Sequence, residues 1–318
     1  MRILITGGTG FVGSHLIAQL LKPGDAKIAV LAFDDPAVPE PGVEYHHADI
    51  RDADTVRTIV RQFEPEHIYH LAGVATMDGA TRQPALAYEV SAIGSHNLFD
   101  AAMSSPHPPR ILYVSTSHVY GRAAGRLTET SPVAPANPYA ASKAMAEVLA
   151  FQYRGRDQGG VITVRSFSHT GPGQTPDYVF PNIAKQFAEI EAGLRPPRLV
   201  LGNLDSKRDF SDIRDAVRAY AMVLARAKVG EVYNVCAGKA VALAEIIEIF
   251  QTVSKIKVEI AQDPARVRAD EIPEICGDLT KIHADTGWKP EIPLEQTIRD
   301  LLDYWRIKVK NQKPAFGR

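Results

Sequence analysis

The stretch "ILITGGTGFVGSHL", from Ile3 to Leu16, decides the fold. Its first residues have the apolar, β-branched character of a buried strand, and the run from Phe11 onward has the spacing of a helix. Three glycines stand between the two runs and a fourth, Gly13, lies in the first turn of the second run; together they satisfy both GxGxxG and GxxGxxG. Glycines at such a turn let the backbone approach a pyrophosphate, whose charge then lies at the helix N-terminus. The alternative is a tight strand–helix turn without a ligand. The residues expected at a dinucleotide are Gly7, Gly10, Phe11, Val12 and Gly13.

Strand-like and helix-like runs alternate through the first half of the chain. Further short apolar runs are "KIAVLAF" (27–33), "HIYHLAG" (67–73) and "RILYVST" (110–116), and helical patterns separate them. This rhythm is typical of βαβ units, so we predict an α/β fold with a Rossmann-type, doubly wound parallel sheet. A P-loop nucleotide site is excluded because no Gly-Lys-Ser/Thr follows the glycines.

The texture changes from about Val161 onward. "GPGQTPD" (171–177) and "LRPPR" (194–198) interrupt the alternation. We expect a smaller C-terminal α+β substrate region over the carboxyl edge of the sheet, where ligands bind in such folds. A strand is expected near 231–238 and an amphipathic closing helix over 294–308. The predicted division is a dinucleotide-binding domain (1–165), a mainly substrate-binding region interleaved with the sheet (166–310) and a flexible tail (311–318).

Composition narrows the class of protein. The 318 residues are 45% hydrophobic with a formal net charge of −1, which gives no reason to expect binding to nucleic acid or anionic membranes. No apolar run approaches the roughly 20 residues of a membrane span, and the first residues read as a strand rather than a signal peptide. Cys236 and Cys276 form no CxxC motif, so a cytoplasmic protein without disulfides is expected. "HHAD" (46–49) and "HIYH" (67–70) lack a full ligand set, and no metal is predicted.

The choice between NAD and NADP depends on the tip of the second strand. An acid there would accept the ribose hydroxyls of NAD, whereas its absence leaves room for the 2′-phosphate of NADP. Asp34 lies 21 residues after Gly13 and could serve. If the strand ends at Ala32, no acid stands at its tip. Both cofactors therefore stay open.

A second motif lies in "ANPYAASKAMAEVLA", Ala136 to Ala150. Asn137 is suited to cap a helix and Pro138 to occupy its first position. Tyr139 and Lys143 then stand one turn apart on one face. A tyrosine has an ordinary pKa near ~10, and a neighbouring ammonium lowers it. The spacing suits a proton donor with its modulating cation, although a surface tyrosine stacked on a lysine stem has the same spacing.

The ordered motifs together carry a resemblance. "ILYVSTSHVYG" (111–121) precedes the YxxxK helix, and with "HLAG" and the glycine turn the chain resembles the extended short-chain dehydrogenases/reductases that act on nucleotide sugars. This resemblance covers nearly the whole chain and implies hydride exchange at nicotinamide C4 of NADP or NAD. It implies that Tyr139 exchanges the proton, that Lys143 tunes it and holds the nicotinamide ribose, and that Thr116 hydrogen-bonds the sugar oxygen. Further cofactor contacts implied by the resemblance are Asp49, Ile50, Leu71, Ala72 and Gly73.

The second half resembles one branch of this family most. "RSFSHTGPGQTPD", "SKRDFSD", "VRADE" and "TGWKPEIPLEQTI" are similar to GDP-4-keto-6-deoxy-D-mannose reductases and to the related GDP-mannose 4,6-dehydratases. Arg208 and Arg268 are thereby implied as pyrophosphate clamps, since a guanidinium binds phosphate oxygens in a bidentate way. The alternative is ion pairing to Asp209 or Glu271.

Two positions depart from the family pattern. Ser168 replaces a substrate-binding asparagine, and His118 stands where dehydratases carry a glutamate that acts on the sugar. A histidine can act as acid or base near neutral pH, or simply bind a neighbouring carbonyl. The substrate residues implied by the resemblance are Thr116, Ser117, His118, Ser168, Arg208 and Arg268.

The expected activity is NAD(P)H-dependent reduction of the 4-keto group of a GDP-4-keto-6-deoxyhexose, which forms GDP-D-rhamnose. The alternatives are a UDP- or GDP-hexose 4-epimerase, a GDP-mannose 4,6-dehydratase and a non-catalytic dinucleotide-sensing scaffold. The resemblance also implies a homodimer, joined through helices at about 85–104 and 139–153 in a four-helix bundle. Those helices could instead only cover the sheet.

Overall fold

A seven-stranded parallel sheet organises the computed structural model, which describes residues 1–36, 38–155, 159–263 and 272–311. The spatial order is β11-β7-β5-β4-β1-β2-β3, so the direction of winding reverses between β1 and β4. The predicted Rossmann-type fold is confirmed, and the reversal marks where such sheets bind ligands. The strands are β1 (Arg2–Thr6), β2 (Lys27–Ala32), β3 (Val43–His47), β4 (His67–His70), β5 (Arg110–Thr116), β7 (Gly160–Ser166) and β11 (Val232–Val235).

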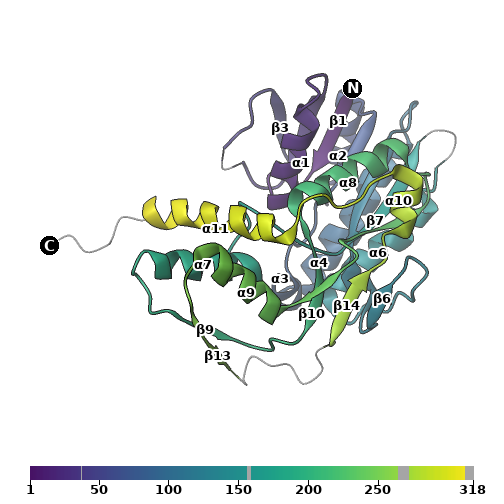
Figure 1. Cartoon of the computed structure of the whole chain (residues 1–318). Helices are drawn as coiled ribbons and strands as arrows, with labels where there is room; N and C mark the ends of the chain where they lie inside the picture. The colour runs from purple at the N-terminus through teal and green to yellow at the C-terminus, as the bar shows by residue number, and fades with distance from the viewer. Residues whose placement is uncertain (37, 156–158, 264–271, 312–318) are drawn as a thin grey trace.

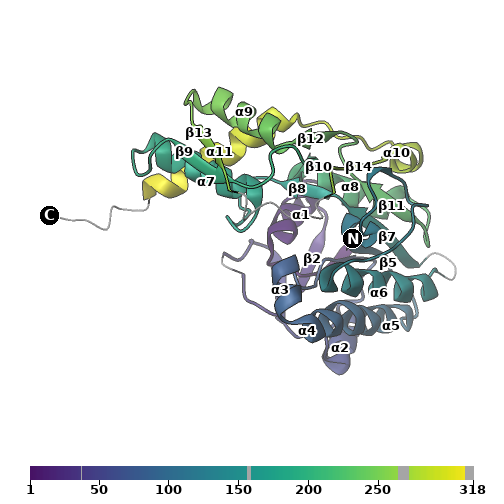
Figure 2. The same cartoon turned by 90° about the horizontal axis from the view of Figure 1, so that it is seen from below.

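Helices cover both faces of this sheet (Figure 2). One face packs on α1 (Phe11–Leu21), α8 (Ile213–Arg226) and α10 (Thr280–Thr286), and the other on α2 (Ala53–Phe63), α5 (Gly94–Met103) and α6 (Pro138–Gln152). Alternate residues of β1 serve the two cores: Ile3 and Ile5 face the first, and Leu4 the second. The alternation and the burial on both sides explain why these strands read as continuous apolar runs.

The segment before α5 combines three short helical pieces. They are α3 (Met77–Arg82), α4 (Pro84–Tyr88) and the π-helical turn η1 (Glu89–Ile93), which leads directly into α5. The segment at about 85–104, expected to be helical, is indeed a nearly continuous helix, and the π-helical turn η1 lies in its middle. Such π turns are frequent near functional sites.

The remaining elements form a smaller α+β region beside the sheet (Figure 1). Its helices α7 (Val179–Glu191), α9 (Leu243–Ser254) and α11 (Leu294–Asn311) share a third core, in which the Phe187 and Phe250 rings lie 5.4 Å apart. The predicted closing helix over 294–308 is thus confirmed, and the expected strand near 231–238 is β11 of the main sheet. The predicted tail lies outside the described residues from 312 onward. The strands are β6 (Gly125–Leu127), β8 (Ser168–Thr170), β9 (Arg198–Leu201), β10 (Lys207–Asp212), β12 (Ala240–Ala242), β13 (Glu259–Gln262) and β14 (Glu274–Gly277).

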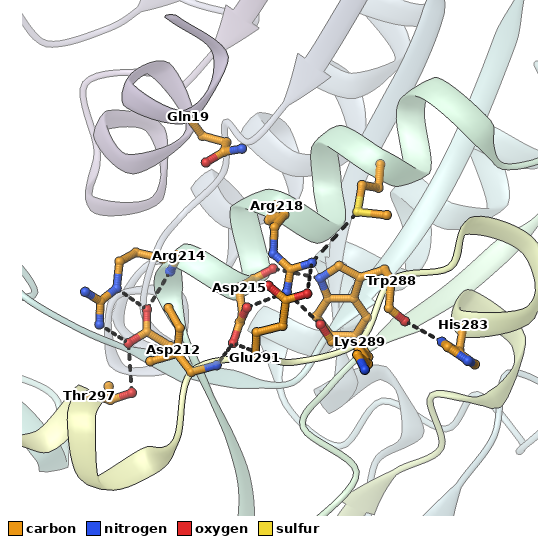
Figure 3. A network of polar contacts seen from close by, with 12 residues as sticks. Gln19, Asp212, Arg214, Asp215, Arg218, His283, Trp288, Lys289, Glu291 and Thr297 are labelled. Atoms are coloured by element: carbon orange, nitrogen blue, oxygen red, sulfur yellow. Dashed lines mark hydrogen bonds and ion pairs between the residues drawn. The ribbon is translucent and has the colours of Figure 1, made fainter. Parts of the chain in front are cut away.

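A polar network fastens the C-terminal segment to α8 (Figure 3). The Asp212 carboxylate caps α8 and accepts the Thr297 hydroxyl of α11 at 2.8 Å. Asp215 accepts the backbone N–H of Glu291 at 2.9 Å through its carboxylate, and its carbonyl accepts the indole N–H of Trp288 at 3.1 Å. Trp288 is fully buried against the main sheet's core. These contacts fix α11, and with it the smaller region, relative to the sheet.

Within the described ranges, no helix has both the length and the apolar character needed to cross a membrane.

Candidate active site

The glycine turn at the end of β1 has two kinds of glycine. Gly7 has a φ of +69°, and a Cβ there would lie 2.9 Å from the backbone nitrogen of Ala72. A Cβ at Gly13 would lie 2.5 Å from the backbone of Gly8, so α1 can rest on the turn only without a side chain. Gly10 is exposed, and a Cβ there would meet only the Gly7 carbonyl at an ordinary 3.5 Å. The protein's own packing therefore requires glycine at Gly7 and Gly13 but not at Gly10. Close approach of a ligand to the backbone would account for the glycine at that third position. The turn fits a dinucleotide pyrophosphate, with Phe11 and Val12 opening the helix behind it.

The "HLAG" segment after β4 lies against this turn. The backbone N–H of Leu71 donates to the Thr6 carbonyl at 3.1 Å, and that of Ala72 donates to the Thr6 hydroxyl at 3.2 Å. His70 is fully buried, and its ring nitrogens lie 2.7 Å from the Thr6 hydroxyl and 2.8 Å from the Ser95 hydroxyl. Burial lowers the pKa of His70 to about 3, so the ring is neutral. This histidine positions Leu71, Ala72 and Gly73 beside the glycine turn.

The helix α6 begins as its sequence predicts. Pro138 is its first residue, and the Asn137 side chain accepts the backbone N–H of Ala140 at 2.9 Å. The Lys143 ammonium donates to the Val114 carbonyl of β5 at 3.0 Å and lies 5.4 Å from the centre of the Tyr113 ring. A Cβ at Gly73 would come within 3.0 Å of the Lys143 nitrogen. Lys143 is thus buried between the end of β5 and the "HLAG" segment, beside the expected cofactor turn.

The two titratable groups of YxxxK are shifted in opposite directions. Exclusion of solvent raises the pKa of Tyr139 to about 12, and interaction with the Thr116 side chain opposes this rise. Burial lowers the pKa of Lys143 to about 8, and the Glu147 carboxylate opposes this fall. At neutral pH the phenol therefore carries its proton, and the ammonium beside it is charged but close to its titration range. Such a pair can deliver a proton to a developing alkoxide.

Thr116, Ser117 and His118 form the corner between β5 and the 3₁₀ turn η2 (Ser117–Tyr120). The Thr116 hydroxyl accepts the backbone N–H of His118 at 3.3 Å and so caps this turn. The His118 ring stands edge-on to Tyr139, with ring centres 6.0 Å apart. Burial, and then the charge of Arg208, lower the pKa of His118, which favours the neutral imidazole. The structure therefore brings a proton donor, a hydroxyl and a neutral histidine to one place.

Arg208 lies on β10, two positions before Phe210, which pairs with Ser168 on β8. Side chains of Arg208 and Ser168 hence project from the same face of this strand pair. The intervening residue, Asp209, points into the interior, where its carboxylate accepts three backbone N–H groups, those of Ala237, Gly238 and Gly277, at 2.7, 2.9 and 3.1 Å. These bonds disfavour Asp209 as the surface ion-pair partner of Arg208. Arg268 and Glu271 lie outside the described residues.

Asp49 and Ile50 follow β3. The Asp49 carboxylate binds the Arg51 guanidinium at 2.6 Å, which lowers the pKa of Asp49, and Arg51 also binds Glu89 at 2.9 Å. Ile50 is buried against Gly94. Asp49 and Arg51 help to line a shallow, open depression in the surface. The contact of Asp49 and Ile50 with adenine stays a prediction.

The tip of the second strand carries no acid. β2 ends at Ala32, and Phe33 and Asp34 follow it as exposed residues. The end of this strand therefore supplies no acid that would select NAD over NADP, and both cofactors stay open. Among the residues that the structure describes, no group of three or more His, Cys, Asp or Glu side chains is arranged to hold a metal ion.

Comparison with known proteins identifies the family of this chain. The profile of the family described as GDP-mannose 4,6 dehydratase matches residues 4–301. The chain is 35% identical to GDP-6-deoxy-D-mannose reductase of Pseudomonas aeruginosa over 98% of its own length and 99% of the relative's. The solved structure of RMD from P. aeruginosa with NADPH shares 34% identity, covers 96% and 99% of the two chains, and gives a TM-score of 0.83. UDP-glucose 4-epimerase of Thermus thermophilus with NAD shares 28% identity over 96% and 99%, with a TM-score of 0.83.

Proposed function

We propose that this chain, which belongs to the GDP-mannose 4,6-dehydratase family, reduces the 4-keto group of a GDP-linked 4-keto-6-deoxyhexose with NADPH or NADH. The observation that carries the proposal is the 35% identity to a GDP-6-deoxy-D-mannose reductase along nearly the whole of both chains. The site supports it, because neutral His118 stands beside Tyr139 at the position where the resemblance places a dehydratase glutamate.

We assign each step of the proposed reduction to residues described above. The bound dinucleotide supplies the hydride at nicotinamide C4. Tyr139 donates its proton to the carbonyl oxygen, and Thr116 hydrogen-bonds the same oxygen. The Lys143 ammonium is assigned the role of opposing, through its charge, the rise that burial causes in the pKa of the phenol. Binding of the pyrophosphate is assigned to the glycine turn, with Leu71 to Gly73 beside the nicotinamide half and Asp49 and Ile50 at the adenine.

The nucleotide sugar is assigned mainly to residues 166–310, and the dinucleotide to residues 1–165. Arg208 and Arg268 would clamp the sugar nucleotide's phosphates, with Ser117, His118 and Ser168 closer to the sugar. The charge of Arg208 lowers the pKa of His118, which supports a phosphate clamp close to the sugar. For an enzyme that acts on nucleotide sugars we expect a cytoplasmic location.

The test is the balance of reduced cofactor. Purified protein is given GDP-4-keto-6-deoxy-D-mannose with NADPH or NADH, and absorbance of the reduced nicotinamide is followed while products are separated. A reductase consumes one reduced cofactor per sugar, because the hydride ends on C4. An epimerase returns the hydride and a dehydratase passes it to C6 of the same sugar, so neither shows net loss. Epimerisation of a UDP- or GDP-hexose without net oxidation would replace this proposal with the epimerase.

Arg208→Ala should weaken the nucleotide sugar far more than the dinucleotide. Removing one charged partner of a buried phosphate costs on the order of 2–5 kcal/mol, or roughly thirtyfold or more in affinity. Titration of GDP and of NADPH into the variant measures both effects. Lys207→Ala is the matched control, because Lys207 is the neighbouring cation on β10 and is exposed. Equal weakening of both ligands would contradict the assignment.

We also propose a homodimer through α5 and α6 in a four-helix bundle. The outer face of α6 leaves apolar side chains in solvent: Met145 is 46% exposed, Val148 66% and Phe151 59%. Ile93 of η1 is 53% exposed as well. Apolar residues at such spacing on one helix face are characteristic of a surface that packs on a second helix pair.

Val148→Asp should therefore convert the dimer into a monomer, because the carboxylate would be buried at the centre of the bundle. Light scattering at micromolar concentration measures the mass. Ile307→Asp is the control, since Ile307 is 63% exposed on α11 and lies outside the proposed interface. A monomeric wild-type protein would refute the dimer.

A further inference from the structure

A buried ion pair lies one helical turn beyond the lysine of YxxxK. The Arg165 guanidinium of β7 approaches the Glu147 carboxylate of α6 with a nitrogen–oxygen distance of 2.8 Å. Its Nε lies 3.2 and 3.1 Å from the two carboxylate oxygens. The two side chains are only 7% and 10% exposed. Removing two charges from water is expensive and gives a fold little net stability, so stability alone does not account for this pair.

The pair links α6, which holds Tyr139 and Lys143, to the neighbouring strands β5 and β7. Ser115 and Arg165 are direct partners across β5 and β7. The Ser115 hydroxyl donates to the Glu147 carboxylate, so α6 is tied to both strands at the level of Thr116. Arg165 also donates to the Glu129 carbonyl at 3.1 Å and lies 4.9 Å from the centre of the Tyr120 ring. Both side chains of the ion pair are therefore held in place by further contacts.

We propose that Glu147 is a positioning residue for the reduction: held by Arg165, it keeps the neighbouring Lys143 ammonium charged and fixes α6 at the height where Tyr139 meets Thr116. This inference rests on the proposed function for its consequence in turnover, although the effect on Lys143 does not depend on the substrate.

The groups around Lys143 show which of them stabilises its positive charge. The Val114 carbonyl and the Tyr113 ring face the ammonium from β5, and the buried neutral His70 faces it from β4. On α6 itself, Tyr139 lies one turn before Lys143, and Glu147 one turn after it. Among these described groups Glu147 bears the negative charge, and it opposes the loss of the ammonium that burial favours. Without that charge, Lys143 deprotonates at lower pH, and the alkaline limit of reduction moves down with it.

The experiment reads the charge of Lys143 directly. Full-length protein labelled with ¹³C at lysine Cε is titrated by NMR, and the Lys143 signal is identified from its loss in Lys143→Met. We compare the wild type with Glu147→Gln and with Glu147→Leu/Arg165→Met. The pKa of Lys143 should fall in both variants: by about one unit or more in Glu147→Gln, the usual size for the loss of one nearby opposite charge, and by less in the double variant, which also loses the positive charge of Arg165. The alkaline limb of the kcat/KM profile should shift by the same amount.

The variants separate positioning from stability. Glu147→Gln leaves the Arg165 charge unpaired and can unfold the protein, whereas the double variant removes both charges and is expected to fold. Ser115→Ala removes one hydrogen bond to the same carboxylate but no charge, and should leave the pKa of Lys143 nearly unchanged. An unaltered Lys143 titration in the folded double variant would overturn the proposal. A wild type that oxidises no cofactor would refute the proposed function alone, because the NMR titration needs no turnover.

Discussion

Replacing Tyr139 by phenylalanine should lower turnover by about a hundredfold or more, while the affinity for the dinucleotide stays nearly unchanged. That factor is the usual contribution of a positioned general acid. The phenol carries its proton at neutral pH, since its pKa is raised to about 12, and it stands beside Thr116 and the Lys143 helix face. Phenylalanine keeps the ring and its packing but has no proton to give. Steady-state reduction of the 4-keto sugar and fluorescence titration with NADPH measure the two effects.

Tyr153→Phe provides the matched control for that variant. Tyr153 caps the other end of α6, where its hydroxyl lies 3.2 Å from a ring nitrogen of His96. Its loss should leave turnover close to that of the wild type. Near-normal turnover of Tyr139→Phe would mean that another group supplies the proton. His118 is the nearest candidate, and a double variant that lacks both groups would identify it.

The sequence predicts the main sheet well because each of its signals is local. The glycine turn, the short apolar strands and the capped YxxxK helix each lie within some fifteen residues. The polar strand β3, "VEYHH", has no such signal: it is an edge strand, and each of its residues is exposed or half-buried. The π-helical turn η1 is equally hidden, since its residues have an ordinary helical pattern.

The site is predicted less completely, because several of its contacts join distant segments. Glu147 and Arg165 lie 18 residues apart and meet because α6 packs against β7. The charge of Arg208 lowers the pKa of His118, because the smaller region folds back over the carboxyl ends of the strands. The one local signal for Glu147 is its spacing, one helical turn after Lys143. Spacing alone does not distinguish a buried partner from a solvated carboxylate.

The neutral state of His118 also bears on the choice between reduction and dehydration. A dehydratase of the resembled family uses a carboxylate there, which carries a negative charge at neutral pH. In this chain burial and Arg208 both favour the uncharged imidazole. Such a ring can donate or accept one hydrogen bond to a sugar hydroxyl, but it lacks the fixed negative charge of a carboxylate. The local chemistry therefore favours a reaction that ends with the proton from Tyr139.

Replacing Gly10 by valine should abolish dinucleotide binding and leave the protein folded. Gly10 has φ −79° and ψ 176°, an extended conformation that valine adopts readily. Its added Cβ would meet only the Gly7 carbonyl at 3.5 Å, an ordinary contact, so folding loses little. The same side chain would project from the exposed side of the turn, where a pyrophosphate must come close to the backbone. Thermal unfolding and titration with NADPH and NADH measure the two consequences separately.

Gly13→Val is the variant that makes this test specific. A Cβ at Gly13 would lie 2.5 Å from backbone atoms of Gly8, far closer than folded proteins allow, so this variant should lose stability outright. Gly10→Val should instead unfold near the wild-type temperature and yet bind neither cofactor. The contrast arises because one glycine is needed by the helix that rests on the turn and the other by the ligand that approaches it. Unchanged cofactor affinity in Gly10→Val would remove the glycine turn from the cofactor site, and with it the physical basis for hydride transfer in this chain.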